Sequence, residues 1–120
     1  MSDVRIKRFD DADRSVELVK GLLEVIEIGG MALGRAEYEP GWRWSRDVAG
    51  DESGQTLCQA SHVGIVLAGE NKVTMADGTV HMMRPGDVFE VGPGHDSEVV
   101  GDVPYVSIHL KGIEEYIEGT

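Results

Sequence analysis

Hydrophobic and polar residues alternate over short stretches along most of this chain. Between His62 and His95, β-rich stretches are separated by glycine, proline or aspartate at intervals of about eight residues, which is typical of antiparallel strands joined by tight turns. The same period-two pattern continues on both sides of this region. It predicts short strands at residues 4–9, 22–28, 31–38, 41–48, 56–67, 72–75, 79–83, 87–91, 97–100 and 105–110.

The segments between the predicted strands carry loop and turn signals. Residues 10–21 are expected to form a loop, because Gly21 weakens the helical alternative for this stretch. Residues 49–55 are the longest polar loop, and the Ala-Asp-Gly sequence at 76–78 predicts a hairpin turn. Residues 112–120 are expected to form either one helical turn or a tail.

Composition favours an all-β fold. The chain has 120 residues with 16 glycines and only two phenylalanines, which suits a turn-rich barrel or sandwich better than a helical bundle. Its length is that of one domain with one hydrophobic core. We therefore predict a single domain over residues 1–120, with N-terminal strands in 1–38, a barrel in 40–110 and a C-terminal tail in 112–120.

The charge of the chain argues against several classes of partner. It carries 22 acidic and 11 basic side chains, a net charge of -11. Such a surface repels phosphate groups, so neither a nucleic acid nor an anionic membrane is expected as a partner. The N-terminus lacks the apolar stretch of a signal peptide, and the apolar run 63–69 is far shorter than the roughly 20 residues that span a bilayer. Because the single cysteine, Cys58, cannot form an intramolecular disulfide, we expect a cytoplasmic protein.

Two short elements resemble a known superfamily. Residues 40–45 are Pro-Gly-Trp-Arg-Trp-Ser, and residues 93–96 are Pro-Gly-His-Asp. A Pro-Gly-Asp turn at 85–87 leads into Val-Phe-Glu-Val and Gly-Pro-Gly. With these features, residues 40–106 resemble the cupin superfamily, and most closely a bacterial subgroup of small cupins that carries both elements. The resemblance implies a double-stranded β-helix, or jelly-roll, barrel.

The resemblance is incomplete at the metal ligands. In the two cupin motifs, G-x5-H-x-H-x3-E-x6-G and G-x5-P-x-G-x2-H-x3-N, three His and one Glu usually hold a metal ion. When the motifs are aligned on Gly69 and Gly86, these four positions are occupied by Thr56, Cys58, His62 and Ser97. The resemblance therefore implies the fold more strongly than it implies a metal ion.

The side chains that remain still make a candidate metal site. His62 and Cys58 are expected on the same inner face, but four residues of extended strand separate them by about 13 Å unless a bulge or bend intervenes. The Gly-Pro-Gly corner can turn His95 into the barrel mouth. The candidate ligands are then His62, His95 and Cys58, with Gln59 or Asp96 assisting. The ion would be divalent iron, manganese, zinc or nickel; the alternative is no metal, with the histidines hydrogen-bonded to each other, to Asp96 or to the backbone.

Two tryptophans add a candidate ligand pocket. Trp42 and Trp44 share one face of the predicted strand 41–48, where they either stack on a flat or sugar-like ligand or pack in the core. His81 and His109 match neither motif and are expected to be exposed or structural. The predicted pocket residues are Trp42, Trp44, Cys58, Gln59, His62, His95 and Asp96.

Two classes of function remain open. One is a cupin that binds a small molecule, with a divalent metal ion as Lewis acid and Asp96 orienting His95 through its second ring nitrogen. The other is a metal-free sensory or ligand-binding module without catalysis. Cys58 is either a nucleophile activated by a neighbouring histidine or a buried thiol that packs as a small hydrophobe. A homodimer is also expected, because an outward-facing apolar row needs cover from another sheet or subunit: Val63, Ile65 and Leu67.

Overall fold

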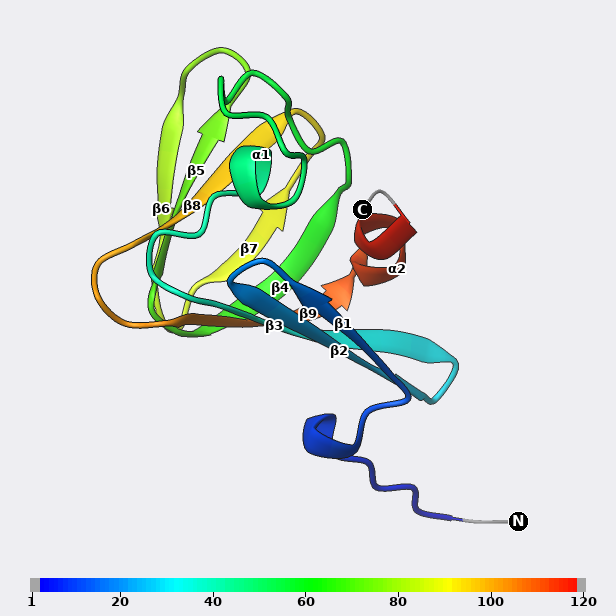
Figure 1. Cartoon of the computed structure of the whole chain (residues 1–120). Coiled ribbons are helices and arrows are strands. Elements are labelled where there is room, and N and C mark those ends of the chain that lie inside the picture. Colours follow the sequence, from blue (N-terminus) through cyan, green and yellow to red (C-terminus); the bar gives the residue numbers. More distant parts are fainter. Residues whose placement is uncertain (1–2, 119–120) are drawn as a thin grey trace.

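The computed structural model describes residues 3–118, which fold into two antiparallel β-sheets with short helices (Figure 1). The larger sheet has the strand order β1-β2-β3-β9-β4-β7, and the smaller sheet has the order β6-β5-β8. The strands are β1 (Arg14–Leu18), β2 (Gly21–Ile28), β3 (Met31–Tyr38), β4 (His62–Ala68), β5 (Glu70–Met75), β6 (Val80–Met83), β7 (Val88–Val91), β8 (His95–Val100) and β9 (Tyr105–Lys111). The helices are a 3₁₀ turn (Phe9–Asp11), α1 (Trp44–Asp47) and α2 (Ile113–Glu118). No helix in this part of the chain is both long and apolar enough to cross a membrane.

The two sheets enclose one core, and alternation along each strand decides which side chains enter it. In β4, His62, Gly64 and Val66 are buried, whereas Val63 and Ile65 are half-buried on the opposite face. The inner side chains of the two sheets form a hydrophobic cluster that also includes residues of both helices. In Figure 1 the long β2–β3 hairpin projects from this barrel toward the N-terminal segment. The predicted all-β jelly-roll barrel is thereby confirmed.

Most predicted strands correspond to observed ones. The predicted strand 31–38 coincides with β3, and residues 76–78 form the turn of the β5–β6 hairpin. The predictions at 22–28, 72–75, 79–83, 87–91, 97–100 and 105–110 fall, within a few residues, on β2, β5, β6, β7, β8 and β9. Alternation identified these strands because each has one face in the core.

The predictions for residues 4–21 are wrong in two places. Residues 4–8 form no strand, and Ile6 is exposed. The predicted loop 10–21 instead contains β1, which pairs with β2 along its whole length. Val16 and Leu18 of β1 pack against the core, and this tertiary contact outweighs the loop-forming composition around them.

The predicted strand 41–48 is also wrong, because four of its eight residues, Trp44–Asp47, form helix α1. The segment begins as expected: Gly41 N–H donates to the Val99 carbonyl of β8, the Trp42 carbonyl accepts from Val99 N–H, and Arg43 forms an isolated bridge with Glu98. The chain then turns, and the Asp96 carboxylate accepts hydrogen bonds from the backbone N–H (2.9 Å) and the hydroxyl (2.7 Å) of Ser45. This long-range anchor at the start of α1 overrides the local alternation.

The predicted strand 56–67 is shorter than expected. Only its second half is β4, and residues before it form a loop in which Cys58 makes an isolated bridge with His95. Thr56 donates through both its backbone N–H and its hydroxyl to the Asp51 carboxylate, which keeps this segment out of the sheet. At the C-terminal end, where either one helical turn or a tail was expected, the structure has helix α2, while positions 119 and 120 lie outside the described residues.

Candidate metal centre and ligand cavity

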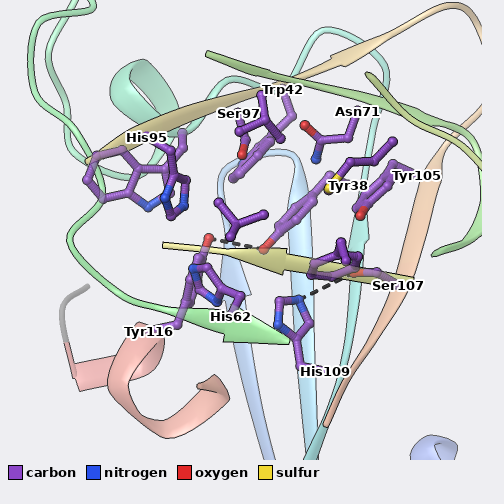
Figure 2. Close-up of a pocket in the computed structure, with 15 residues that line it drawn as sticks. Tyr38, Trp42, His62, Asn71, His95, Ser97, Tyr105, Ser107, His109 and Tyr116 are labelled. Atoms are coloured by element: carbon purple, nitrogen blue, oxygen red, sulfur yellow. Dashed lines mark hydrogen bonds between the residues drawn. The ribbon is translucent and has the colours of Figure 1, made fainter. Parts of the chain in front are cut away.

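A small cavity lies between the two sheets, and most of the candidate residues surround it (Figure 2). Its volume is about 40 Å³, which is room for about three water molecules. The lining residues come from both sheets and both helices, and their polar or aromatic members include Tyr38, Trp42, Trp44, His62, Asn71, His95, Ser97, Tyr105, Ser107, His109 and Tyr116. The cavity is thus the place where candidate chemistry from distant parts of the sequence comes together.

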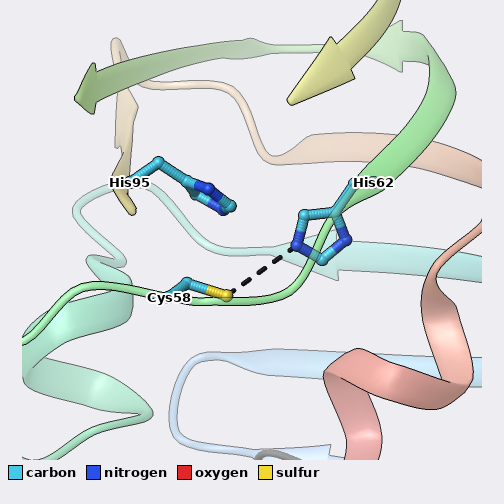
Figure 3. A group of neighbouring side chains, drawn as sticks. All are labelled: Cys58, His62 and His95. Atoms are coloured by element: carbon cyan, nitrogen blue, oxygen red, sulfur yellow. Dashed lines mark hydrogen bonds between the residues drawn. The ribbon is translucent and has the colours of Figure 1, made fainter. Parts of the chain in front are cut away.

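Cys58, His62 and His95 form a buried cluster at one side of this cavity (Figure 3). The ligand atoms of the three side chains all lie within 4.8 Å of one another. The Cys58 Sγ atom is 3.8 Å from Nε2 of His62, and the His62 and His95 rings have centroids 5.3 Å apart in an edge-on arrangement. Two of these residues, His62 and His95, stand at the first positions of β4 and β8.

The backbone around Cys58 explains why the cluster forms despite the sequence separation. Cys58 N–H donates to the His95 carbonyl (2.7 Å), and the Cys58 carbonyl accepts from Gly94 N–H (2.8 Å) and His95 N–H (3.2 Å). This bridge fixes Cys58 beside the start of β8. The chain then bends into β4, so the 13 Å separation expected for about four extended residues does not apply.

The ring of His95 is held in one tautomer. Its Nδ1 lies 2.6 Å from the Gly92 carbonyl oxygen, and a carbonyl can only accept, so Nδ1 carries the proton and donates. The lone pair of Nε2 is therefore left for a metal ion. Metal-binding histidines are commonly oriented in this way, by a hydrogen bond from the other ring nitrogen to a backbone carbonyl. The predicted contact with Asp96 is not made, because that carboxylate binds Ser45 instead.

Gln59 does not reach the site. Its side chain is exposed, and its amide contacts the Leu57 carbonyl at 3.4 Å. Alternation places Gln59 on the opposite side of the chain from buried Cys58 and Ala60. Of the two assisting side chains that the sequence suggested, neither Gln59 nor Asp96 therefore contacts the histidines.

Burial keeps the histidines of the cavity neutral. The pKa of His62 is lowered to about 3, mainly by burial and then by the nearby rings of His109 and His95. Burial also lowers the pKa of His95, and it lowers the pKa of His109 to about 4. Neutral imidazole is the form of histidine that binds a metal ion.

The donor set and its spacing suit a metal ion. For tetrahedral zinc, with metal–sulfur and metal–nitrogen distances near 2.3 and 2.0 Å, a sulfur and a nitrogen ligand lie about 3.6 Å apart. The observed separation of Cys58 Sγ and His62 Nε2, 3.8 Å, is close to this value. A site with three protein ligands leaves a fourth position for a bound molecule. The group of Cys58, His62 and His95 can therefore hold a metal ion.

His109 is one of the cavity residues that sequence reasoning missed. It is buried against the cavity, with its ring centroid 5.3 Å from that of His62 and its Nε2 3.3 Å from the Ser107 hydroxyl oxygen. The strand register places His109 between Gly34 of β3 and Gly64 of β4, both without a side chain. Alternation along β9 contained the signal, because buried Tyr105 predicts that residues two and four further along also face inward.

Aromatic side chains close the rest of the cavity. The Tyr38 ring stacks on Trp42 with centroids 3.8 Å apart and an interplanar angle of 7°. Trp42 is only 1% exposed and lines the cavity, so its ring packs in the core beside this space. The hydroxyl of Tyr38 donates to that of Tyr116 (3.0 Å), which brings α2 against the site. Trp44 also lines the cavity from α1.

Solved structures with the same architecture were found, although no protein-family model and no curated protein sequence matches the chain. Ectoine synthase from P. lautus is 12% identical, with 96% of this chain and 86% of that chain covered and a TM-score of 0.65. KdgF from a Halomonas species is 13% identical, with 85% and 90% covered and a TM-score of 0.54. A cupin-like protein from Thermotoga maritima is 14% identical, with 78% and 70% covered and a TM-score of 0.52. At these identities the similarity shows the fold alone: this chain is a cupin-type β-barrel.

Proposed function

We propose that this protein binds a divalent metal ion through Cys58, His62 and His95, and holds a small molecule in the cavity beside it. The observation that carries the proposal is the convergence of three buried ligand atoms within 4.8 Å of one another. A thiol sulfur and two imidazole nitrogens that converge in this way are a donor set that one divalent metal ion can bind. One ring, that of His95, is already oriented by a hydrogen bond to the Gly92 carbonyl.

The ligand chemistry favours some ions over others. A thiolate with two imidazoles is a soft and borderline donor set, which suits zinc or iron better than manganese. When bound, such an ion supplies a Lewis acid for an oxygen donor at its open position. The protein's own contribution is to present neutral imidazoles, to orient His95 and to limit access of water through the aromatic wall of the cavity. We infer that the barrel binds a small molecule, and that the other residues lining the cavity decide which class of molecule it accepts.

The test is metal analysis of protein purified without a histidine tag. Wild-type protein should contain about one equivalent of metal per chain. Cys58→Ser, His62→Ala and His95→Ala should each bind the metal about tenfold or more weakly. Each variant should therefore lose most of its metal during purification. His81→Ala is the matched control, because His81 is exposed and should leave the metal content unchanged. Cobalt-substituted protein should show a thiolate charge-transfer band that disappears in Cys58→Ser.

Two results would contradict the metal site. One is sub-stoichiometric metal in every preparation, including protein refolded with zinc or iron. The other is metal that persists unchanged in His62→Ala, which would place the ion elsewhere. The first result would favour the metal-free ligand-binding module.

A further inference from the structure

The cavity is surrounded by polar atoms that have no partner within the protein. Among the described residues, six buried side-chain nitrogen or oxygen atoms lack a hydrogen bond. Five of the six belong to residues that line this one cavity. They are Trp42 Nε1, Trp44 Nε1, His62 Nδ1, Asn71 Oδ1 and His109 Nδ1. Because native proteins leave few buried polar atoms unpaired, their concentration here indicates a polar occupant.

The chemistry of these atoms restricts what the occupant can be. An indole N–H only donates, so Trp42 and Trp44 require acceptor oxygens on the ligand. The Asn71 side-chain oxygen only accepts, so it requires a donor such as a hydroxyl. The neutral His109 ring can serve either need through Nδ1. A ligand with oxygen acceptors and at least one hydroxyl matches this set.

The charge of the site selects a monoanion. The described residues that line the cavity include no Lys, Arg, Asp or Glu. A divalent ion bound by one thiolate and two neutral imidazoles would leave a single positive charge next to this neutral cavity. One negative charge on the ligand balances it, whereas a dianion or a cation would bury an uncompensated charge.

The size and shape of the cavity limit the ligand to a few atoms. A volume of about 40 Å³ holds about three water molecules. The β5–β8 register pairs Met75 with His95 and Asn71 with Val99, so Asn71 lies four residues along the strands from the metal group, about 13 Å. Figure 2 shows Asn71 and His95 on different sides of the cavity. The Asn71 side chain extends into this distance from one end, and the histidines and the metal ion extend into it from the other. The space that remains between them fits a ligand with two or three carbon atoms.

We propose that the cavity binds a short hydroxycarboxylate monoanion, with its carboxylate toward the metal group and the indole N–H groups and its hydroxyl toward Asn71 and His109. This inference rests on the proposed metal function and adds the class of ligand. It assigns Asn71 and His109 as a subsite that selects acids carrying a hydroxyl at the end remote from the carboxylate.

The intrinsic fluorescence of the protein provides the test, because its two tryptophans, Trp42 and Trp44, both line the cavity. Zinc-loaded protein, with its metal content measured on the same sample, is titrated with 3-hydroxypropionate and propionate, and with glycolate and acetate. The two acids in each pair differ by one hydroxyl. We expect at least one hydroxy acid to bind about tenfold more tightly than its partner, since a site built to bond a hydroxyl discriminates against the analogue lacking it.

Variants separate the subsite from the metal. Asn71→Leu should abolish the preference for the hydroxy acid, while leaving the metal content and the affinity for the plain acid unchanged. Gln59→Leu, the same change of an amide to leucine at an exposed position, should retain the preference. The comparison of the acids uses wild-type protein only, so this test remains available even if Asn71→Leu does not fold.

The outcomes distinguish the two proposals. Fully zinc-loaded protein that binds both members of each pair alike would overturn the subsite while leaving the metal site intact. A preference that survives in folded Asn71→Leu would equally overturn it. Protein that takes up no metal would contradict the proposed function, and with it the ligand class inferred from its charge.

Discussion

At the scale of single residues, one carboxylate organises the loop that leads to the cluster of Cys58, His62 and His95. Asp51 accepts hydrogen bonds from the backbone N–H and hydroxyl of Ser53 and from those of Thr56. These hydrogen bonds hold the pKa of Asp51 well below its usual range, and the bonds from the Ser53 and Thr56 hydroxyls contribute most. The loop ends two residues before Cys58, so its order helps to place the thiol.

We predict that Asp51→Asn destabilises the protein at neutral pH and that the effect is pH-dependent. A carboxyl whose pKa is lowered on folding contributes stability that is present above its unfolded pKa, about 3.9, and is lost as the pH falls toward its folded pKa. The difference in unfolding free energy between wild type and Asp51→Asn should therefore shrink progressively below about pH 4. Urea denaturation across this range measures it. Asp102→Asn, at an exposed turn, is the control, and a difference for Asp51→Asn that stays constant in acid would refute the prediction.

Individual residues also show where sequence reasoning reaches the site and where it stops. Cys58, His62 and His95 were found because cysteine and histidine are uncommon and lie near positions of the cupin motifs. His109 was missed because it matches no motif, although alternation along β9 already turned it inward. The binding partner of Asp96, Ser45, is 51 positions away in sequence, and no local pattern could have identified that contact.

At the scale of elements, most strands were predictable, whereas β1 and helix α1 were not. A strand with one face in the core leaves a period-two pattern, as β3 and β9 do. Helix α1 has the alternation of a strand and becomes helical because β8 supplies Asp96. Helix α2 follows Gly112, whose φ of 93° is in the left-handed region that favours glycine. A Cβ added to Gly112 would also meet the Ser61 carbonyl, so this glycine lets α2 pack beside the start of β4.

We predict that Gly112→Ala displaces α2 and weakens the site. The substitution combines the cost of a positive φ, about 1 kcal/mol, with the steric contact, for a total loss of roughly 2–4 kcal/mol in the free energy of unfolding. Gly101→Ala is the matched control, because Gly101 has a similar φ of 82° but nothing within 4 Å of its added Cβ. Denaturant titration gives the two free energies, and metal content reports on the site. Equal losses for the two variants would show that the contact with Ser61 does not constrain α2.

At the scale of the whole molecule, the outer face of the larger sheet is divided into two halves. The register places one row of outward side chains across five strands: Glu24, Arg35, Ile108, Ile65 and Val88. On the β2–β3 side, Arg35 pairs with Glu24 at 3.2 Å and with Glu37 at 2.8 Å. On the β9–β4–β7 side the row is apolar. Its member Val88 is 71% exposed, and the neighbouring Leu67 and Leu110 are 53% and 38% exposed. An apolar area of this kind, bordered by charges, is typical of a protein–protein contact.

We predict that a second copy of the chain covers this apolar half-face, so that the protein is a homodimer. The contact would be isologous, with the same residues of both subunits facing each other across a two-fold axis. Two chains that each carry a charge of -11 repel each other, and salt screens this repulsion. Dimerisation should therefore strengthen as the ionic strength rises, which sedimentation at micromolar concentration can follow. Val88→Glu should shift the protein to monomer, whereas Val80→Glu, at an exposed valine of the smaller sheet, should not. A wild-type monomer at high salt, or a dimer unaffected by Val88→Glu, would show that this face has another role.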